Sequence, residues 1–190
     1  MNRTKITNFK GIKYAHRVRD LETLWEIFSL KDYDLMKSFV PRNGNVVLEA
    51  GAGIGEYTMI ASGLVGYNGK LIGIEPNKES YSYLKKNIKL NNLENVIPVN
   101  AAVSNKIGKI KIFSIPGTSV IDSVESDWAG TKNFYFVNSV TIDSLVKKFN
   151  LQKLDMVKLD IEGAEYLALL GAKRTLEKFR PRLMMEIHSK

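Results

Sequence analysis

The stretch VVLEAGAGIGEYT, Val46 to Thr58, joins an apolar run to three glycines at alternate positions. Its apolar run has the length of a buried strand, and a helical pattern begins after the last glycine. Gly51, Gly53 and Gly55 form G-x-G-x-G, where a backbone without Cβ atoms can turn sharply and let a ligand approach main-chain atoms. The stretch therefore predicts a strand, a glycine turn and a helix that bind a nucleotide-type cofactor.

Four further apolar runs alternate with helical patterns along the chain: KLIGIEP, NVIPVNA, DMVKLDIE and RLMMEIH. This alternation is typical of repeated β-α-β units, whose parallel sheet is buried on both faces. A length of 190 residues with 44% hydrophobic residues suits one domain. We predict a single α/β domain over 1–190, with a Rossmann-like core over 45–190, a mainly parallel twisted sheet and helices on both faces.

Further elements are expected around this core. Residues 1–44 are interpreted as a leader and an extra helix that begins behind Asp20 as N-cap. The runs GKIKIFSI and FYFVNSV predict a β segment around 108–140, added antiparallel to the sheet.

Two helix boundaries can also be predicted. Asn77 is a candidate N-cap for a helix that ends at Asn91 and Asn92. Gly171 separates two short helices, the second of which ends before Pro181.

Polar residues end each of the five apolar runs: Glu49, Glu75, Asn100, Asp160 and His188, with Glu186 two positions before the last. The carboxyl ends of parallel strands share one edge, which is where open α/β sheets bind ligands. A cap for the following helix would explain any one of these residues. Because a polar residue ends all five runs, a common ligand site is the favoured interpretation.

The nature of the cofactor follows from the acids near the glycines. Glu75 lies 22 residues after Gly53, where a carboxylate can accept hydrogen bonds from both ribose hydroxyls. Glu56 stands where the dinucleotide pattern needs its last glycine, and the phosphate-loop pattern is missing. Glu49, Glu56 and Glu75 around one ligand suit a cation. S-adenosylmethionine carries a sulfonium, an ammonium and a ribose, so it is the predicted cofactor.

Composition excludes some functions. The chain has no cysteine, which removes disulfides, thiolate zinc sites and cysteine nucleophiles and favours a cytoplasmic location. No apolar run approaches the roughly 18 residues of a membrane span. The net charge is +8, and residues 1–20 hold six Lys or Arg against one Asp. Lysines on solvent-facing helix surfaces explain much of this charge, so a nucleic-acid partner stays open but is not favoured.

Four segments together resemble one family: VVLEAGAGIG, GIEPNKESYSYLKKNIKLNN, KLDIEGAE and RPRLMMEIH are similar to the FkbM family of S-adenosylmethionine-dependent methyltransferases. The resemblance implies the class I methyltransferase fold and O-methylation of a hydroxyl on a small molecule, sugar or lipid-linked glycan. Glu49 stands where the family usually has Asp. The fold normally continues into a sixth and seventh strand, so either the chain is truncated or KIKIF and FYFV complete the sheet differently.

The resemblance also implies a role for individual residues. Gly51, Gly53 and Gly55 would line the methionine part of the cofactor, Glu75 would hold the ribose, and Asn100 with Ala101 would border the adenine. The predicted cofactor-binding set is Glu49, Gly51, Ala52, Gly53, Gly55, Glu56, Tyr57, Glu75, Pro76, Asn100 and Ala101.

Methyl transfer to a hydroxyl needs an oxygen held in line with the methyl group and a base within reach. The candidate catalytic residues are Asp160, Glu162 and His188. A divalent metal held by Asp160, Glu162 and Glu186 is an alternative, but their spacing is not that of a regular ligand set, so no metal site is predicted.

Two other functions stay open. RNA methylation is supported by the basic leader, although cysteine is absent and DIEG replaces the Asn/Asp-Pro-Pro-aromatic turn of base-amino methyltransferases. A non-catalytic module that only binds S-adenosylmethionine is the third reading.

Overall fold

The computed structural model describes residues 4–29, 40–114, 122–123 and 132–186. Its centre is a five-stranded sheet in the order β11-β10-β3-β4-β5, with every neighbouring pair parallel. The strands are β3 (Val46–Ala50), β4 (Lys70–Ile74), β5 (Val96–Val99), β10 (Met156–Leu159) and β11 (Arg182–Met185). The five predicted strands and their common direction are confirmed.

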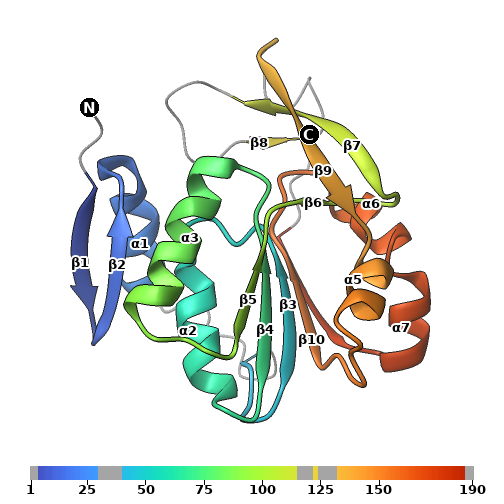
Figure 1. The fold of residues 1–190 in the computed structure, drawn as a ribbon, viewed down its shortest axis with the longest axis horizontal. Coiled ribbons are helices and arrows are strands. Elements are labelled where there is room, and N and C mark those ends of the chain that lie inside the picture. The colour runs from blue at the N-terminus through green and yellow to red at the C-terminus, as the bar shows by residue number, and fades with distance from the viewer. Residues whose placement is uncertain (1–3, 30–39, 115–121, 124–131, 187–190) are drawn as a thin grey trace.

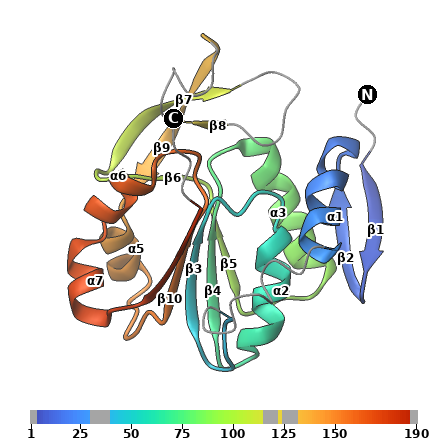
Figure 2. The same cartoon turned by 180° about the vertical axis from the view of Figure 1, so that it is seen from behind.

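Helices cover both faces of this sheet, as predicted (Figure 1). One face packs on α2 (Glu56–Val65) and α3 (Lys78–Leu90), through side chains such as Val47 and Ala61. The other face packs on α5 (Ile142–Lys148), α6 (Glu165–Leu170) and α7 (Lys173–Phe179), as the view from behind in Figure 2 also shows. No helix in the described part of the chain is long and apolar enough to cross a membrane.

A second sheet lies over the carboxyl edge of the first (Figure 1). It contains β6 (Ala102–Val103), β7 (Gly108–Ser114), β8 (Asp122–Ser123) and β9 (Phe134–Val140) in the order β6-β9-β7-β8. The added β segment is thus confirmed, but its expected place in the central sheet is wrong. The reason is that Ile112 and Val137 turn inward and, with Ala102, form a small core of their own.

The N-terminal segment holds a hairpin that was not predicted. It consists of β1 (Lys5–Phe9) and β2 (Ile12–His16), which pair antiparallel through a turn with positive φ at Lys10 and Gly11. The side chain of Asn87, on α3, fixes β2 because it accepts a hydrogen bond from the amide of Ala15 at 2.6 Å and donates one to its carbonyl at 3.0 Å. The hairpin therefore packs beside α3, as Figure 1 shows.

The predicted extra helix is α1 (Leu21–Ser29), which follows the short 3-10 helix η1 (Val18–Asp20). Asp20 precedes α1 as expected, but its carboxylate accepts hydrogen bonds from the backbone and side chain of Arg17 at 2.7–3.0 Å. Asp20 therefore secures the turn before the helix.

The other predicted helix ends are confirmed. The Asn77 side chain accepts hydrogen bonds from the amides of Glu79 and Ser80 at the start of α3, and Asn91 is the C-cap. Gly171 is the C-cap of α6 and separates it from α7.

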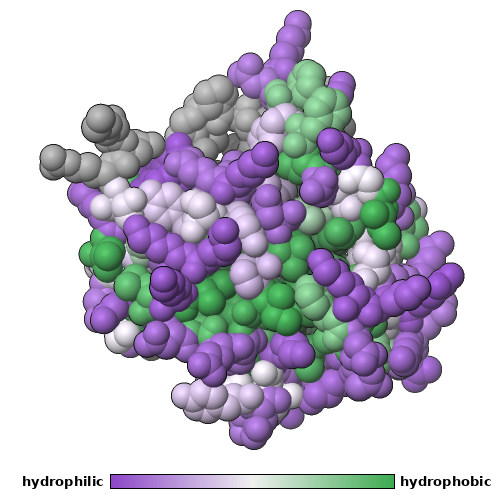
Figure 3. Space-filling view, viewed as in Figure 1, coloured by the Kyte–Doolittle hydropathy of each residue, from purple (hydrophilic) through white to green (hydrophobic). Residues whose placement is uncertain are grey.

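The surface in Figure 3 is mostly hydrophilic, and its hydrophobic residues gather near the middle of the face shown. The edge strand β5 lies on this side of the molecule (Figure 1). Pro98 lies within β5, and a proline on an edge strand removes a hydrogen-bond donor that a second sheet could pair with.

Candidate active site

A cavity of about 490 Å³ lies at the carboxyl edge of the central sheet. This size is in the range of small-molecule sites. Its walls come from the glycine turn after β3, the ends of β4 and β10, the N-terminal segment and the inner side of the second sheet. Polar residues from distant parts of the chain thus meet at one place, at the edge where the sequence predicts a ligand.

The glycine turn forms the floor of the cavity. Gly51, Ala52 and Gly53 line it, whereas Gly55 does not. Gly51 has φ +81°, and a Cβ atom there would lie 1.8 Å from the carbonyl oxygen of Asp160. Gly55 has φ +103°, and its Cβ would meet Met59 and Leu84 within 3 Å. Part of this bare backbone therefore accommodates the protein's own atoms, and Gly55 serves helix packing.

Glu75 connects the glycine turn to the loop before α3. One carboxylate oxygen accepts a hydrogen bond from the amide of Gly53 at 2.9 Å, and the other accepts one from the amide of Asn77 at 2.8 Å. Pro76 and Ala101 line the cavity beside it. Asn100 does not, because its side-chain amide donates to the backbone carbonyls of Glu75 and Pro76 and so supports this wall from behind.

Glu49 is an acid buried inside β3, with 1% of its surface exposed. The Thr58 hydroxyl donates a hydrogen bond to its carboxylate at 2.5 Å. Burial raises the pKa of Glu49 to about 8, against the opposing effects of the Lys158 charge and the Thr58 hydrogen bond. A ligand cation in the cavity would favour the ionised form of this carboxyl.

Glu56 begins α2 and also lines the cavity, as does its neighbour Tyr57. Its carboxylate turns back to accept a hydrogen bond from the amide of Ile54 at 3.0 Å. Burial raises the pKa of Glu56 to about 7, and the negative charge of Asp20 acts in the same direction. Glu49 and Glu56 are therefore poised to carry more negative charge once a cation is present.

The end of β10 supplies the predicted catalytic residues. Asp160, Glu162 and Glu186 all line the cavity. The Asp160 side chain is 30% exposed, and Glu162 adopts a positive φ of 52° directly before Gly163. His188 lies outside the described residues.

Two parts of the site were missed by the sequence reasoning. Lys158 lies within β10, lines the cavity and is only 4% exposed. The sequence did contain an indication of this role. Lys158 is a single positive charge within the apolar run DMVKLDIE, two positions before Asp160 and therefore on the same face of the strand.

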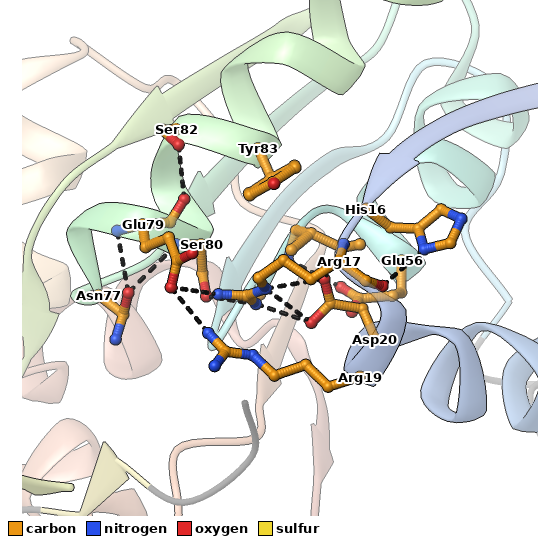
Figure 4. A network of polar contacts seen from close by, with 12 residues as sticks. His16, Arg17, Arg19, Asp20, Glu56, Asn77, Glu79, Ser80, Ser82 and Tyr83 are labelled. Carbon is orange, nitrogen blue, oxygen red and sulfur yellow. Dashed lines mark hydrogen bonds and ion pairs between the residues drawn. The ribbon is translucent and has the colours of Figure 1, made fainter. Parts of the chain in front are cut away.

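The second missed part is the N-terminal wall, from which Arg17, Arg19 and Asp20 line the cavity. Arg17 lies between Asp20 and Glu79 in Figure 4, with nitrogen to oxygen distances of 2.8 and 2.9 Å. Arg19 contacts the same Glu79 carboxylate at 2.7 Å. These arginines had been interpreted as part of a basic leader.

The metal alternative finds no support in the described part of the chain. Within it, no group of three or more His, Cys, Asp or Glu side chains is arranged to hold a metal ion. Asp160, Glu162 and Glu186 line one cavity without forming such a group.

Comparison with known proteins identifies the family. The methyltransferase FkbM domain matches residues 49–190, which includes the glycine turn and the DIEGAE segment. The chain belongs to the FkbM methyltransferase family. The resemblance and the class I methyltransferase fold predicted from the sequence are thereby confirmed, and S-adenosylmethionine is the cofactor of this family.

Individual relatives act on different acceptors. The chain is 24% identical over 187 residues to the hexuronic acid methyltransferase AglP of Haloferax volcanii, covering 97% of this chain and 74% of AglP. It is 26% identical over 157 residues to the catalytic subunit TRM61 of the tRNA (adenine(58)-N(1))-methyltransferase of Yarrowia lipolytica, covering 75% of this chain and 40% of TRM61.

A solved structure shares the fold. The fibrillarin of Aeropyrum pernix, in complex with S-adenosylmethionine, aligns with a TM-score of 0.50 at 14% identity, covering 98% of this chain and 63% of the fibrillarin.

Proposed function

We propose that the protein transfers a methyl group from S-adenosylmethionine to a hydroxyl oxygen of a sugar or sugar-containing small molecule. The observation that carries this proposal is the position of Asp160, a partly exposed carboxylate whose backbone touches the glycine turn of the same cavity. Similarity to a hexuronic acid methyltransferase over nearly the whole chain supports the sugar-type acceptor.

The cofactor would occupy the side of the cavity formed by the glycine turn and Glu75. Gly51 and Gly53 line the part of the cavity that would hold the methionine part, and the Glu75 carboxylate would accept hydrogen bonds from the ribose hydroxyls. Burial raises the pKa of Glu49 to about 8 and that of Glu56 to about 7, and a bound sulfonium and ammonium would favour the ionised form of both acids. Ala101 borders the adenine side in this arrangement.

The acceptor would lie on the side of Asp160, Glu162 and Glu186. Its oxygen forms a bond to the methyl carbon while the bond from that carbon to sulfur breaks, and the hydroxyl proton passes to Asp160. S-adenosylhomocysteine and the methyl ether are the products. Positioning of this kind can supply roughly 7 to 11 kcal/mol of the barrier reduction, and a base adds about 10²- to 10⁴-fold in rate.

Arg19 lies at the N-terminal wall of the same cavity, beside Glu79 of α3, and is the second contact that we propose for such an acceptor. Its side chain is 28% exposed at the cavity wall, and its buried Nε has no hydrogen-bond partner among the described residues. A guanidinium at this position suits a hydroxyl or carboxylate of a sugar acid.

The test is a methylation assay with three acceptors: glucuronic acid, glucose and an unmodified tRNA transcript. S-adenosylhomocysteine release measures turnover, and NMR of the product distinguishes a methyl ether from a methyl ester. We expect a methyl ether on a sugar, with turnover reduced at least tenfold in Asp160→Asn. Methylation of the transcript alone would favour the RNA alternative, which the similarity to TRM61 and the charge of +8 support. Cofactor binding with no turnover on any acceptor would favour a non-catalytic module.

A further inference from the structure

Lys158 occupies an unusual position for a charged side chain. It lies in β10, an interior strand of the central sheet between β11 and β3, and is paired in register with Glu49 on β3. Its side chain is on the face that packs against α2, because Met156 on the same face joins the core cluster of Tyr57 and Ala61. Burying an ammonium here costs free energy unless nearby groups compensate its charge.

The surroundings of Lys158 provide that compensation. Its Nζ donates a hydrogen bond to Oδ2 of Asp160 at 2.9 Å. Its charge opposes the effect of burial on the pKa of Glu49, and its ammonium lies 5.6 Å from the centre of the Tyr57 ring. The ammonium thus connects an acid in the floor of the cavity with the acid at the strand end.

We propose that Lys158 is a positioning residue of the methyltransferase site, which holds the Asp160 carboxylate in one orientation at the cavity wall. This inference rests on the proposed function, in which Asp160 receives the acceptor proton. Asp160 is 30% exposed, so without a partner its carboxylate would be free to turn toward solvent. The Lys158 side chain is only 6% exposed, so its position is fixed by the residues packed around it and it can hold the carboxylate in place.

Four variants test the role: Lys158→Met, Lys158→Arg, Asp160→Asn and the double variant Lys158→Met/Asp160→Asn. The matched control is Lys153→Met, because Lys153 forms the same type of contact two positions away, with Asp155 at 3.4 Å, but is 54% exposed and lies outside the cavity. Methionine replaces the lysine with an apolar chain of similar length but removes the positive charge beside Glu49 and Asp160, so urea denaturation of each variant separates a loss of stability from a loss of activity.

We expect Lys158→Met to lower kcat by about 10- to 100-fold with the acceptor KM changed by less than about threefold. The double variant should lose no more activity than Asp160→Asn alone, and Lys158→Arg should recover part of kcat. Wild-type kcat in Lys158→Met, or losses that multiply in the double variant, would overturn the proposal.

A crystal structure of each protein with S-adenosylhomocysteine gives a readout that needs no acceptor. We expect Asp160 to contact Lys158 in the wild type and to turn away in Lys158→Met. If no sugar is methylated, the proposed function fails while this structural comparison still decides the role of Lys158. An Asp160 orientation unchanged in Lys158→Met would contradict the inference.

Discussion

The Glu75 carboxylate accepts a hydrogen bond from the backbone amide of Gly53 at 2.9 Å. Its other oxygen accepts one from the amide of Asn77, the N-cap residue of α3. The end of β4 thus shapes the glycine turn after β3 and the loop that leads into α3. An acid at this strand end has a structural task in addition to any contact with a ribose.

Replacing Glu75 should weaken cofactor binding. In Glu75→Ala the two loops lose a shared acceptor and the ribose loses its proposed partner, so we expect S-adenosylhomocysteine to bind more weakly by about 1 to 3 kcal/mol. Isothermal titration calorimetry measures the effect. Glu94→Ala is the matched control, since Glu94 is exposed and lies outside the cavity. Equal affinities in the two variants would argue against a cofactor site at Glu75.

Gly51 should not tolerate even a methyl group. A Cβ atom would lie 1.8 Å from the Asp160 carbonyl oxygen, and φ is +81°. We therefore expect Gly51→Ala to lower the free energy of unfolding by more than about 1 kcal/mol. Gly63→Ala is the control, because Gly63 lies in α2 and, apart from its chain neighbours and the backbone of its own helix, no atom lies within 4 Å of its Cβ position, so alanine there should be neutral or stabilising. Urea denaturation of both variants checks the contrast, and equal stabilities would contradict it.

Arg17 secures the N-terminal wall of the cavity. Its side chain and that of Asp20 are 3% and 2% exposed, so Arg17→Met leaves a buried carboxylate without its cation. Breaking such a pair costs about 3 to 5 kcal/mol. We expect a loss of that order in urea denaturation, together with faster amide exchange over residues 12–20. Arg42→Met, at an exposed arginine, should change stability by less than about 0.5 kcal/mol.

A second variant separates charge from packing at this wall. In Arg17→Met/Asp20→Asn the uncompensated charge is removed as well, so part of the lost stability should return. If the double variant is no more stable than Arg17→Met, the contribution of Arg17 comes from the packing of its side chain and not from the ion pair.

The sheet could be predicted from the sequence because its strands are buried on both faces. Runs such as Val46–Ala50 and Met156–Leu159 are therefore nearly continuous in apolar residues. The helical patterns between the runs predict that the strands are parallel. The acids at the carboxyl ends of these strands could be predicted because each one directly follows or interrupts an apolar run. Asn100 and Gly55 do not line the cavity as predicted, because their roles depend on tertiary contacts outside it. Asn100 donates a hydrogen bond to the Glu75 carbonyl, and Gly55 lies against Met59 and Leu84.

The remaining features depend on contacts between distant residues. Arg17 contacts Glu79 across 62 positions of sequence, and Lys158 meets Glu49 only because β10 and β3 are neighbours in a given register. In the hairpin, the alternation of KITNF and IKYAH around Lys10 and Gly11 was a usable signal. This segment, with its six Lys or Arg in residues 1–20, was instead interpreted as a basic leader. The place of β7 and β9 in a separate sheet depends on the tertiary packing of Ile112.

The buried acid Glu49 should make the protein less stable as the pH rises. Burial raises its pKa to about 8 in the folded chain, against an ordinary value of 4.5. Between these two pH values the folded state keeps a proton that the unfolded state has released, so the free energy of unfolding falls as the pH rises. This contribution is fully present below about pH 4.5 and is lost by about pH 8, with a slope of up to ~1.4 kcal/mol per pH unit for one group.

Comparison with Glu49→Gln isolates this effect from all other titrating groups. Glutamine keeps an acceptor for the Thr58 hydroxyl but cannot ionise, so its stability relative to the wild type should increase steadily from pH 5 to pH 8. Urea denaturation at each pH gives the difference, with the exposed Glu94→Gln as a control that should follow the wild type throughout. Parallel curves for Glu49→Gln and the wild type would mean that Glu49 is already ionised in the folded protein, and Lys158 would then be the group that keeps its charge in place.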